Sequence, residues 1–469
     1  MSKKIAIIGG GISGLCTALK LVDNNQVYVF EKDSDFGGLS KSIEWKGYYF
    51  DIGPHAFHTN DKELIEEFKE IMDNEIISFE KKVLINFNGK YYKYPLKPFD
   101  ILFGMNPFFS FWCIINLLFI KTKYKFIKTQ DISADKWLYN RFGKPLYKLF
   151  FEDITKKVWG VHPNKLSSYF AKHRIPTINL RDIILRGIFN RQKSFDEGHK
   201  FAPQVFRAYY PNKKGIGYFI EKLANKIKSK GGELFNSSEI TKINLKNNKV
   251  YSIEFKQKNK IITFYPEILI STMPLDSLIK RLNPLPKLNN ISDKIAYRSL
   301  LILCIVVNKD MVFKPLHLYF KDKFFHRLSE IKNFNRKLFP KGKTGLMAEI
   351  TCNYNDNIWK MGDKEVFEKA VKDIEKERFF KESDVEDYFI IRIKHAYPMY
   401  LLGFEKALNE IYMNLSKIKN LYSTGRQGLF RYIDIDICMK NAFDLAYEIN
   451  TGENKKVYDK FDIEETPYM

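Results

Sequence analysis

The chain has 469 residues, of which 45% are hydrophobic and 28% are charged. This length is too great for one compact core and predicts two or three domains, and the composition is typical of a globular protein. The five cysteines are widely separated and form no Cys-x-x-Cys pair. We therefore expect neither a metal site nor a disulfide framework.

The chain is strongly basic, with 77 lysines and arginines against 55 aspartates and glutamates and a net charge of +22. Such an excess favours an anionic partner, such as a nucleic acid, a membrane surface or a phosphorylated substrate. No nucleic-acid motif is present, and the basic residues are spread along the chain, so a solvated lysine-rich surface is the alternative explanation. The N-terminal segment has a strand pattern and not that of a signal peptide, which predicts a cytoplasmic protein.

A strand, a glycine-rich turn and a helix are predicted at the N-terminus. Residues 5–8 form a short apolar run that suits a strand buried on both faces. Gly9-x-Gly11-x-x-Gly14 follows and leads into an apolar helical pattern. Gly9 suits a tight turn, Gly11 lets the backbone approach a pyrophosphate, and Gly14 lets the helix pack on the strand. The helix N-terminus would then face the phosphates.

A second apolar run, residues 27–30, completes a βαβ pattern and ends in Glu31. An acid about 20 residues beyond the glycines is placed to accept hydrogen bonds from a ribose. The segment therefore predicts a dinucleotide-binding site. The alternative is a glycine-rich turn in an ordinary α/β domain.

The middle of the chain alternates between helical and strand patterns. Residues 61–80 predict a helix and then a strand, and residues 82–96 predict a hairpin that turns at Asn88-Gly89. Helices are expected over 131–160, a mobile loop over 191–204 and a helix over 219–227. Residues 233–272 have a strand pattern, and residues 297–354 alternate apolar and polar side chains, which predicts a mixed sheet.

Residues 101–120 contain no charged side chain, and four lysines follow within eight residues. The length would suffice for a membrane span, but Asn106-Pro107 has the pattern of a turn, so two short helices are favoured over one span. We predict peripheral, salt-sensitive attachment to a membrane surface. The alternative is that these side chains close a homodimer or pack inside the protein.

Near the C-terminus, a strand at 421–424 precedes Gly425-Arg426-Gln427-Gly428, and a helix is expected from about Ile435. A strand that ends in glycine and leads into a helix forms a second anion-facing or flavin-facing turn. For Arg426 a functional role is favoured. For Asp434 a functional role and simple helix capping are equally compatible with the pattern.

The glycine motif, the segment Glu31 to Ser40 and the segment Tyr49 to His55 together resemble the glutathione-reductase-type FAD fold of amine oxidases, protoporphyrinogen oxidases and UDP-galactopyranose mutases. The fold class is thus predicted as α/β: a Rossmann-like FAD-binding domain, an inserted helical domain and a mixed β-sheet substrate domain. The resemblance implies an FAD-binding domain at 1–80, 215–290 and 418–450, a helical domain at 98–200, a substrate domain at 81–97, 201–214 and 291–417, and a tail at 451–469.

The resemblance is most specific for UDP-galactopyranose mutases. Gly53-Pro54-His55-Ala56-Phe57-His58-Thr59 resembles a flavin-side segment of that family, and Gly425 to Asp434 resembles its GRLGxYxYxD segment. The family's remaining motifs have similar stretches in Thr155 to Trp159, Arg174-Ile175-Pro176, Tyr297-Arg298-Ser299, Phe325-His326-Arg327 with Lys332, and Tyr397-Pro398.

This resemblance implies roles for residues on both sides of the flavin. Those implied on the substrate side are Arg174 and Arg327 at the diphosphate, Tyr397, Tyr432, His55, His58 and Trp159. Those implied to bind the cofactor are Gly9, Gly11, Ser13, Gly14, Glu31, Lys32, Gly38, Leu39, Ser40, Gly53, Pro54, His55, Ile240, Gly425, Arg426, Tyr432, Ile433 and Asp434.

The function implied is a non-redox pyranose–furanose isomerisation through an adduct at N5 of reduced FAD, with NAD(P)H as external reductant, in cell-surface glycan biosynthesis such as that of lipopolysaccharide. The chain departs from the family at two positions. It has Ile154 where the family has an aromatic residue that stacks on uracil, and Val158 where the family has glutamine. A nucleotide-linked or polyprenyl-linked sugar is therefore expected. The alternatives are an FAD oxidase or desaturase of the amine oxidase or protoporphyrinogen oxidase type, and a flavoprotein that acts as a membrane-assembly partner.

Overall fold

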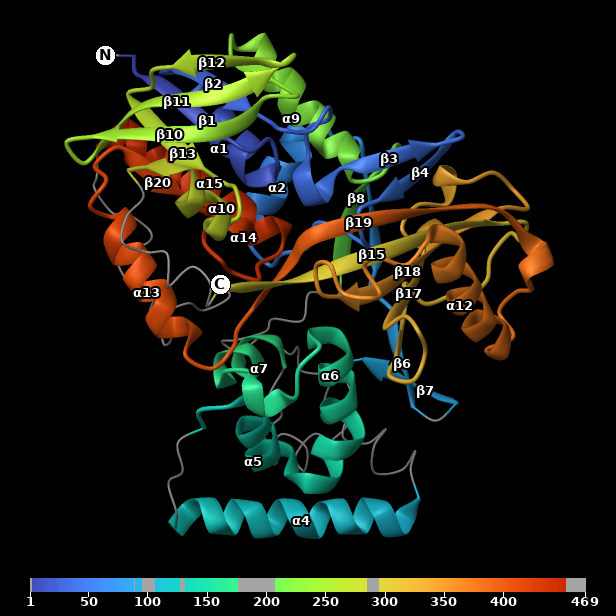
Figure 1. Ribbon diagram of the computed structural model, residues 1–469. Coiled ribbons are helices and arrows are strands. Elements are labelled where there is room, and N and C mark those ends of the chain that lie inside the picture. The colour runs from blue at the N-terminus through green and yellow to red at the C-terminus, as the bar shows by residue number, and fades with distance from the viewer. Residues whose placement is uncertain are drawn as a thin grey trace.

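The computed structural model describes residues 2–87, 89–94, 106–126, 131–175, 207–284 and 295–452. Figure 1 shows two sheet-containing regions one beside the other and a helical region below them, with helix α4 at its lower end. The chain passes between these regions several times, so that residues from distant parts of the sequence meet where the regions join.

A five-stranded parallel sheet contains the N-terminus of the chain. Its strand order is β20-β13-β1-β2-β9. The strands are β1 (Lys4–Ile8), β2 (Gln26–Phe30), β9 (Glu233–Phe235), β13 (Ile268–Ser271) and β20 (Leu421–Ser423). Helices α1 (Ile12–Leu21), α9 (Gly217–Ser229) and α15 (Ile435–Thr451) pack together beside it. The predicted βαβ unit is thereby confirmed.

A smaller sheet lies against this parallel sheet, in the order β12-β11-β10-β14. It consists of β10 (Glu239–Lys246), β11 (Lys249–Gln257), β12 (Lys260–Phe264) and β14 (Leu282–Asn283), and helix α10 (Leu275–Arg281) precedes β14. Phe30 of β2 contacts Phe255 and Phe264 of this sheet, with ring centroids 4.9 and 5.4 Å apart. Aromatic burial thus joins the two sheets.

The mixed sheet predicted from alternation is a seven-stranded sheet in the order β19-β15-β18-β17-β16-β6-β7. Its strands are β6 (Val83–Phe87), β7 (Lys90–Tyr94), β15 (Ala296–Val307), β16 (His317–Phe320), β17 (Arg327–Glu330), β18 (Thr344–Cys352) and β19 (Val385–Met399). Helix α12 (Asp363–Lys376) packs against it, and α13 (Phe404–Leu415) follows β19. The predicted hairpin β6–β7 joins the sheet through the parallel pair β6–β16.

Two short ladders connect these sheets. They are β3 (Ser42–Trp45) with β4 (Tyr48–Asp51), and β5 (Ile76–Glu80) with β8 (Arg207–Pro211); α2 (Lys62–Ile71) precedes β5. Asp51 accepts hydrogen bonds from Ser42 Oγ and Tyr210 Oη, both at 2.6 Å, and from the Ile216 amide. Burial raises the pKa of Asp51 to about 6 although these bonds act in the opposite direction.

The helical region consists of α4 (Pro107–Phe126), α5 (Ala134–Leu146), a π-helical stretch (Tyr147–Glu152), α6 (Asp153–Trp159) and α7 (Ser168–Arg174). The prediction of two short helices over 101–120 is wrong for the described part, because Pro107 to Phe126 is one helix. Asn106 and Pro107 begin this helix: the Asn106 side chain accepts a hydrogen bond from the Phe108 amide at 2.9 Å, and proline suits a first helical turn.

Within the described ranges, no helix combines the length and the apolar character that a membrane crossing requires. The loop predicted at 191–204 and residues 101–105 of the apolar stretch lie outside the described residues.

Candidate functional site

The glycine turn between β1 and α1 has the geometry of a phosphate cradle. A Cβ at Gly14 would lie 2.0 Å from the Gly9 carbonyl oxygen, so only glycine lets the helix pack on the turn. A Cβ at Gly11 would meet nothing closer than the Gly37 carbonyl oxygen at 3.7 Å. Space is thus left beside Gly11, at the first turn of α1, where Ser13 is buried.

Glu31 lies at the carboxyl end of β2 and faces this turn. Its carboxylate accepts hydrogen bonds from the backbone amides of Gly10, at 2.8 Å, and Asp33, at 3.0 Å. The Gly37 amide donates to the Gly10 carbonyl at 2.7 Å, which holds the segment Gly38–Ser40, with Leu39 at its centre, against the glycine turn. Lys32, in contrast, is exposed and paired with Asp33 at 2.7 Å, in a position typical of a surface residue.

The C-terminal segment around Gly425 packs directly on the glycine turn. A Cβ at Gly425 would lie 2.4 Å from Ser13 Oγ, so the two segments are in contact. Arg426 donates to the carbonyl oxygens of Ile433, at 3.2 Å, and Ala396, at 3.0 Å. Its buried Nε and the buried Gln427 Oε1 have no hydrogen-bond partner among the described residues.

Three aromatic side chains and two arginines meet where the helical region joins β19 and the segment at 425–434. The ring centroids of Tyr397 and Tyr432 are 5.2 Å apart, and each lies 6.1 Å from that of Trp159. Arg174, at the end of α7, lies over the Tyr432 ring at 3.6 Å, and Arg426 lies 4.1 Å from the same ring. Two arginines thus contact one aromatic ring.

Arg327 lies directly opposite Glu349 in the β17–β18 ladder. Its guanidinium forms two hydrogen bonds with the Glu349 carboxylate, one of them at 2.8 Å, and donates to Tyr319 Oη at 3.1 Å. Glu349 is 1% exposed. The pair is therefore a buried, bidentate ion pair, and the geometry of Arg327 is set by a strand rather than by a loop.

The segment Gly53 to His58 adds two histidines with different surroundings. A Cβ at Gly53 would lie between Glu349 Oε1, at 3.4 Å, and His55 Nε2, at 3.6 Å, so this glycine lets the segment approach the ion pair, and Pro54 joins it to His55. Burial lowers the pKa of His55 to about 4, and Arg426 contributes to the same shift. His55 is therefore neutral at pH 7.

Asp434 does not act as a helix cap. It lies at the N-cap position of α15, but its side chain caps no backbone amide. Its carboxylate lies 3.6 Å from His58 Nε2 instead. Burial acts to raise the pKa of Asp434, but His58, Arg174 and Arg426 outweigh it and lower the pKa below its usual range. Asp434 is thus a carboxylate that balances part of the arginine charge.

Lys81, between β5 and β6, is influenced by the charge of Asp434 and by that of Asp436. Burial lowers the pKa of Lys81 to about 8, although the charges of Asp434 and Asp436 act to raise it. Lys81 therefore changes charge close to neutral pH. Sequence reasoning missed both Lys81 and Glu349. The only available signal for Glu349 was a single acid in the middle of the otherwise uncharged stretch 344–352.

The motif residue Lys332 and the expected cofactor-binding residue Ile240 have structural partners of their own. Lys332 donates to the Asp310 carboxylate at 2.8 Å and to the Pro340 carbonyl at 3.0 Å, which is a structural role. Ile240 is buried in β10, and its carbonyl accepts from Arg281 at 2.5 Å. The chain just before β10 contacts the end of β2, because the Ser238 amide donates a hydrogen bond to the Glu31 carbonyl. Ile240 therefore lies in a strand that begins beside Glu31.

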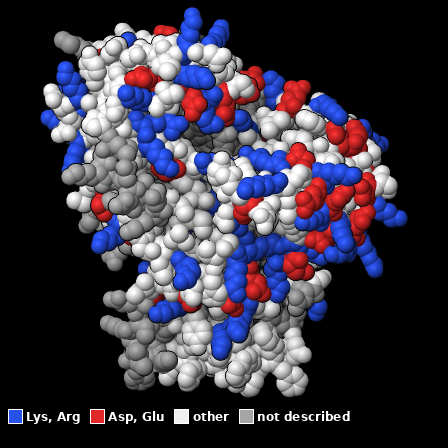
Figure 2. Space-filling model, in the orientation of Figure 1, with Lys and Arg blue, Asp and Glu red and all other residues white. Residues whose placement is uncertain are grey.

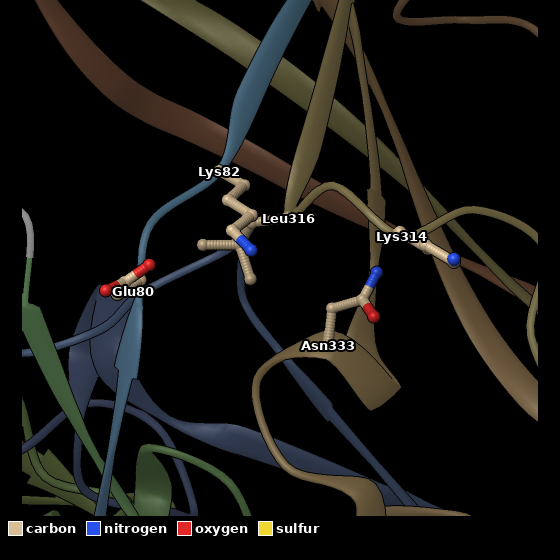
Figure 3. A pocket seen from close by; sticks show the side chains of 5 residues that line it. All are labelled: Glu80, Lys82, Lys314, Leu316 and Asn333. Carbon is tan, nitrogen blue, oxygen red and sulfur yellow. The ribbon is translucent and has the colours of Figure 1, made fainter.

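A separate pocket of about 330 Å³ is lined by Glu80, Lys82, Lys314, Leu316 and Asn333 (Figure 3). None of the predicted site residues lines it. The Asn333 amide is already engaged with the carbonyl oxygens of Phe313 and Pro315, both at 2.8 Å. This pocket therefore lies apart from the arginine and aromatic cluster.

The residues present fit FAD. The space beside Gly11, the acid at the end of β2 and the uncapped first turn of α1 suit a dinucleotide. The unpartnered polar atoms of Arg426 and Gln427, together with Thr424 Oγ1, leave donors and acceptors for a flavin ring beside Gly425. These atoms are buried, and buried polar groups are normally paired, so a bound group that hydrogen-bonds to them accounts for all three.

Comparison with known proteins agrees with this geometry. The NAD(P)-binding Rossmann-like domain family matches residues 7–71. Coproporphyrinogen III oxidase of Staphylococcus aureus is 26% identical over 58% of this chain and 61% of its own length. A protein of Klebsiella pneumoniae named probable UDP-galactopyranose mutase is 26% identical over 37% of this chain and 45% of its own. The matches thus span less than two thirds of either relative.

Among solved structures, a crystal structure of reduced UDP-galactopyranose mutase superposes with a TM-score of 0.82 at 21% identity, covering 98% of this chain and 96% of that one. The parallel sheet, the small four-stranded sheet and the seven-stranded sheet of this protein are thus arranged in the fold of that structure. In its fold, the chain is therefore similar to UDP-galactopyranose mutase, and its N-terminal segment matches the NAD(P)-binding Rossmann-like domain family.

Proposed function

We propose that this protein is a flavin-dependent mutase that interconverts the pyranose and furanose forms of a sugar carried on a phosphate or diphosphate, in the synthesis of cell-surface glycans. The observation that carries the proposal is the convergence of arginines on an aromatic cluster beside the flavin-type turns. Arg174 and Arg426 share the Tyr432 ring, and both Arg327 and Arg426 act on the pKa of His55. Always-charged guanidinium groups suit the binding of a diphosphate.

When bound, reduced flavin supplies the nucleophile for the anomeric carbon of the sugar. The residues of the chain have to hold the phosphates while the bond between sugar and phosphate breaks and forms again. Arg174 lies at the end of a helix, whereas the Arg327 side chain is held by Glu349. The Arg174 side chain therefore has more conformational freedom than that of Arg327. We assign Arg327 to a fixed contact with one phosphate and Arg174 to a contact formed when the substrate enters.

Tyrosine hydroxyls provide further donors. Burial raises the pKa of Tyr397 well above its usual value, and Glu349 acts in the same direction. Tyr397 is therefore protonated at pH 7 and able to donate to a phosphate oxygen. His55, which is neutral at this pH, is suited to accept a hydrogen bond and not to neutralise a phosphate.

The carrier of the sugar is proposed to differ from uridine. Ile154 is a half-buried aliphatic side chain on α6 and provides no flat ring on which a base could stack. A polyprenyl-linked sugar satisfies the arginines equally well, since these recognise phosphate rather than the carrier. NAD(P)H is the external reductant that we propose for the flavin.

The test is to incubate dithionite-reduced and oxidised protein with a uridine-diphosphate sugar and with a polyprenyl-diphosphate sugar, and to follow the ring form by NMR. We expect ring interconversion only with reduced protein and more of it with the polyprenyl substrate. The Arg174→Ala variant, with FAD still bound, is the control for diphosphate recognition. If neither sugar changes its ring form with reduced protein, the proposal is wrong.

A second candidate is an FAD oxidase. The similarity to coproporphyrinogen III oxidase favours it, and arginines also pair with the carboxylates of an acidic substrate. Oxygen consumption by oxidised protein with a coproporphyrinogen, without ring chemistry on either sugar, would identify this function instead.

A further inference from the structure

Helix α4 presents a face of large apolar side chains to solvent. Phe108 is 86% exposed, Phe119 is 67% exposed and Trp112 is 55% exposed. Four more exposed apolar side chains lie on the same helix: Phe111, Ile114, Ile115 and Leu118. A contiguous apolar surface of this kind on a globular protein normally meets another apolar phase.

The opposite face of α4 fixes how this surface is oriented. Cys113 is 2% exposed and packs in one cluster with Leu146 and Phe150, together with the partly buried Leu117. Asn116 Oδ1 accepts a hydrogen bond from the Lys144 amide at 3.1 Å, which ties α4 to α5. The helix is apolar on both faces, yet only one face is covered by its own domain.

A groove of about 540 Å³ runs between α4 and the helices above it. Apolar and neutral residues form one part of its lining (Phe109, Trp112, Asn116, Pro145 and Leu149), and lysines form the other (Lys144, Lys148 and Lys321). No acidic side chain lines it, and none of the three lysines forms an ion pair with a residue that the structure describes. In Figure 2 the described part of the lowest surface is almost free of charged side chains on the side shown, and both basic and acidic side chains lie above it.

We propose that the exposed face of α4 docks on an anionic lipid bilayer, with its apolar side chains in the interfacial layer and Lys144, Lys148 and Lys321 at the headgroup phosphates. A helix that lies in the plane of the interface needs this combination of an apolar face and nearby cations. A second copy of the chain fits less well, because a symmetric contact through α4 would bring two sets of lysines together. The proposal concerns a partner and is independent of the reaction that the flavin site performs.

The test uses the full-length, flavin-loaded protein and two kinds of vesicle, phosphatidylcholine alone and an equimolar mixture with phosphatidylglycerol. We expect co-sedimentation with the mixed vesicles at low salt and much less at high salt or without the anionic lipid. In the Lys144→Gln/Lys148→Gln/Lys321→Gln variant, the partition coefficient should fall roughly 100-fold, since each lysine near an anionic surface contributes about a factor of five.

A matched control carries the same charge change on the far side of the molecule. Lys256, Lys258 and Lys260 lie on or between the exposed ends of β11 and β12, and their replacement by glutamine should leave partition within about twofold of the wild type. Similarly, Phe119→Asp should abolish binding, whereas Ile261→Asp, at a position that is also 67% exposed, should not. Unchanged thermal unfolding and flavin content would show that the variants are folded.

Depth is measured independently through Trp112. With brominated lipid in the mixed vesicles, the wild type should lose fluorescence that Trp112→Phe does not lose, because Trp112 lies on the exposed face. Wild-type protein that stays in the supernatant with mixed vesicles at low salt would overturn the proposal. So would a dimer in light scattering that Phe119→Asp converts to monomer while vesicle binding is absent.

Discussion

At the scale of single residues, Arg327 and Arg174 should differ in what they contribute to stability, because only Arg327 forms a buried ion pair with Glu349. Arg327→Ala leaves a carboxylate that is 1% exposed without its partner, so the free energy of unfolding should fall by about 3–5 kcal/mol. Arg174→Ala removes the contact with the Tyr432 ring and the influence of a half-buried charge on Asp434, and should cost about 1 kcal/mol. Denaturant unfolding of the flavin-loaded variants measures both.

The control for this prediction is the double variant Arg327→Ala/Glu349→Gln, which should regain much of the lost stability because no buried charge remains. The variants Arg174→Ala and Arg327→Ala should each bind the sugar diphosphate about 10- to 100-fold more weakly while FAD stays bound. Equal losses of stability in the two single variants would show that the ion pair is not the cause.

Lys81 predicts a pH dependence. Its pKa of about 8 means that its positive charge is present at pH 7 and lost as the pH rises towards 9. The affinity of the oxidised protein for pyrophosphate, measured by calorimetry, should therefore fall over this range. Lys81→Arg should keep tight binding at pH 9, and Lys81→Gln should bind more weakly and without this pH dependence.

The free energy of unfolding, measured as a function of pH, should provide independent evidence for the lowered pKa of Lys81. In the unfolded chain a lysine has a pKa of about 10.4, so the unfolded state binds more protons than the folded state between about pH 8 and pH 10.4. The stability contribution of Lys81 thus rises with pH in this window. Lys81→Gln should remove that rise, whereas Lys82→Gln, at the exposed neighbouring position, should not.

At the scale of elements, two glycines of the N-terminal strand–turn–helix unit have different roles. Gly14 allows the helix to pack on the turn, and Gly11 leaves space for the cofactor. Gly14→Ala would place a Cβ 2.0 Å from a backbone oxygen and should destabilise the fold by about 1–3 kcal/mol. Gly11→Ala meets only ordinary contact distances within the protein, so it should fold normally and lose FAD affinity. Thermal unfolding and the flavin absorbance of purified protein distinguish these results. A Gly11→Ala variant with full flavin content would place the cofactor elsewhere.

Helix α4 shows where local patterns are ambiguous. Asn106-Pro107 has the pattern of a turn, and the same two residues also suit the start of a helix, where the amide that proline lacks is not needed. Which of the two forms is decided by packing, because Cys113 and Leu117 gain contacts with Leu146 and Phe150 only in one continuous helix.

At the scale of the whole molecule, the site is assembled from the N-terminal turn, the β17–β18 pair, the end of α7 and the segment at 425–434. A ligand that binds only this assembled state stabilises the fold through mass action, by about 2.7 kcal/mol when its concentration is 100 times its Kd. Removal of FAD should therefore lower the melting temperature, and added FAD should restore it in a concentration-dependent way. A melting temperature that does not respond to FAD would contradict this.

The sequence by itself determined the glycine turn, the βαβ unit, the hairpin at 82–96 and the presence of strands in the mixed sheet, because each depends on residues that are close together in the chain. It also identified Arg174, Tyr397, Tyr432 and Asp434 as residues of one site through their motifs. Only the tertiary structure decided that Arg327 faces Glu349, that Lys81 lies within the electrostatic influence of Asp434 and that one face of α4 stays exposed. These depend on strand register, burial and the contacts of distant segments, and none of them leaves a periodic pattern in the sequence.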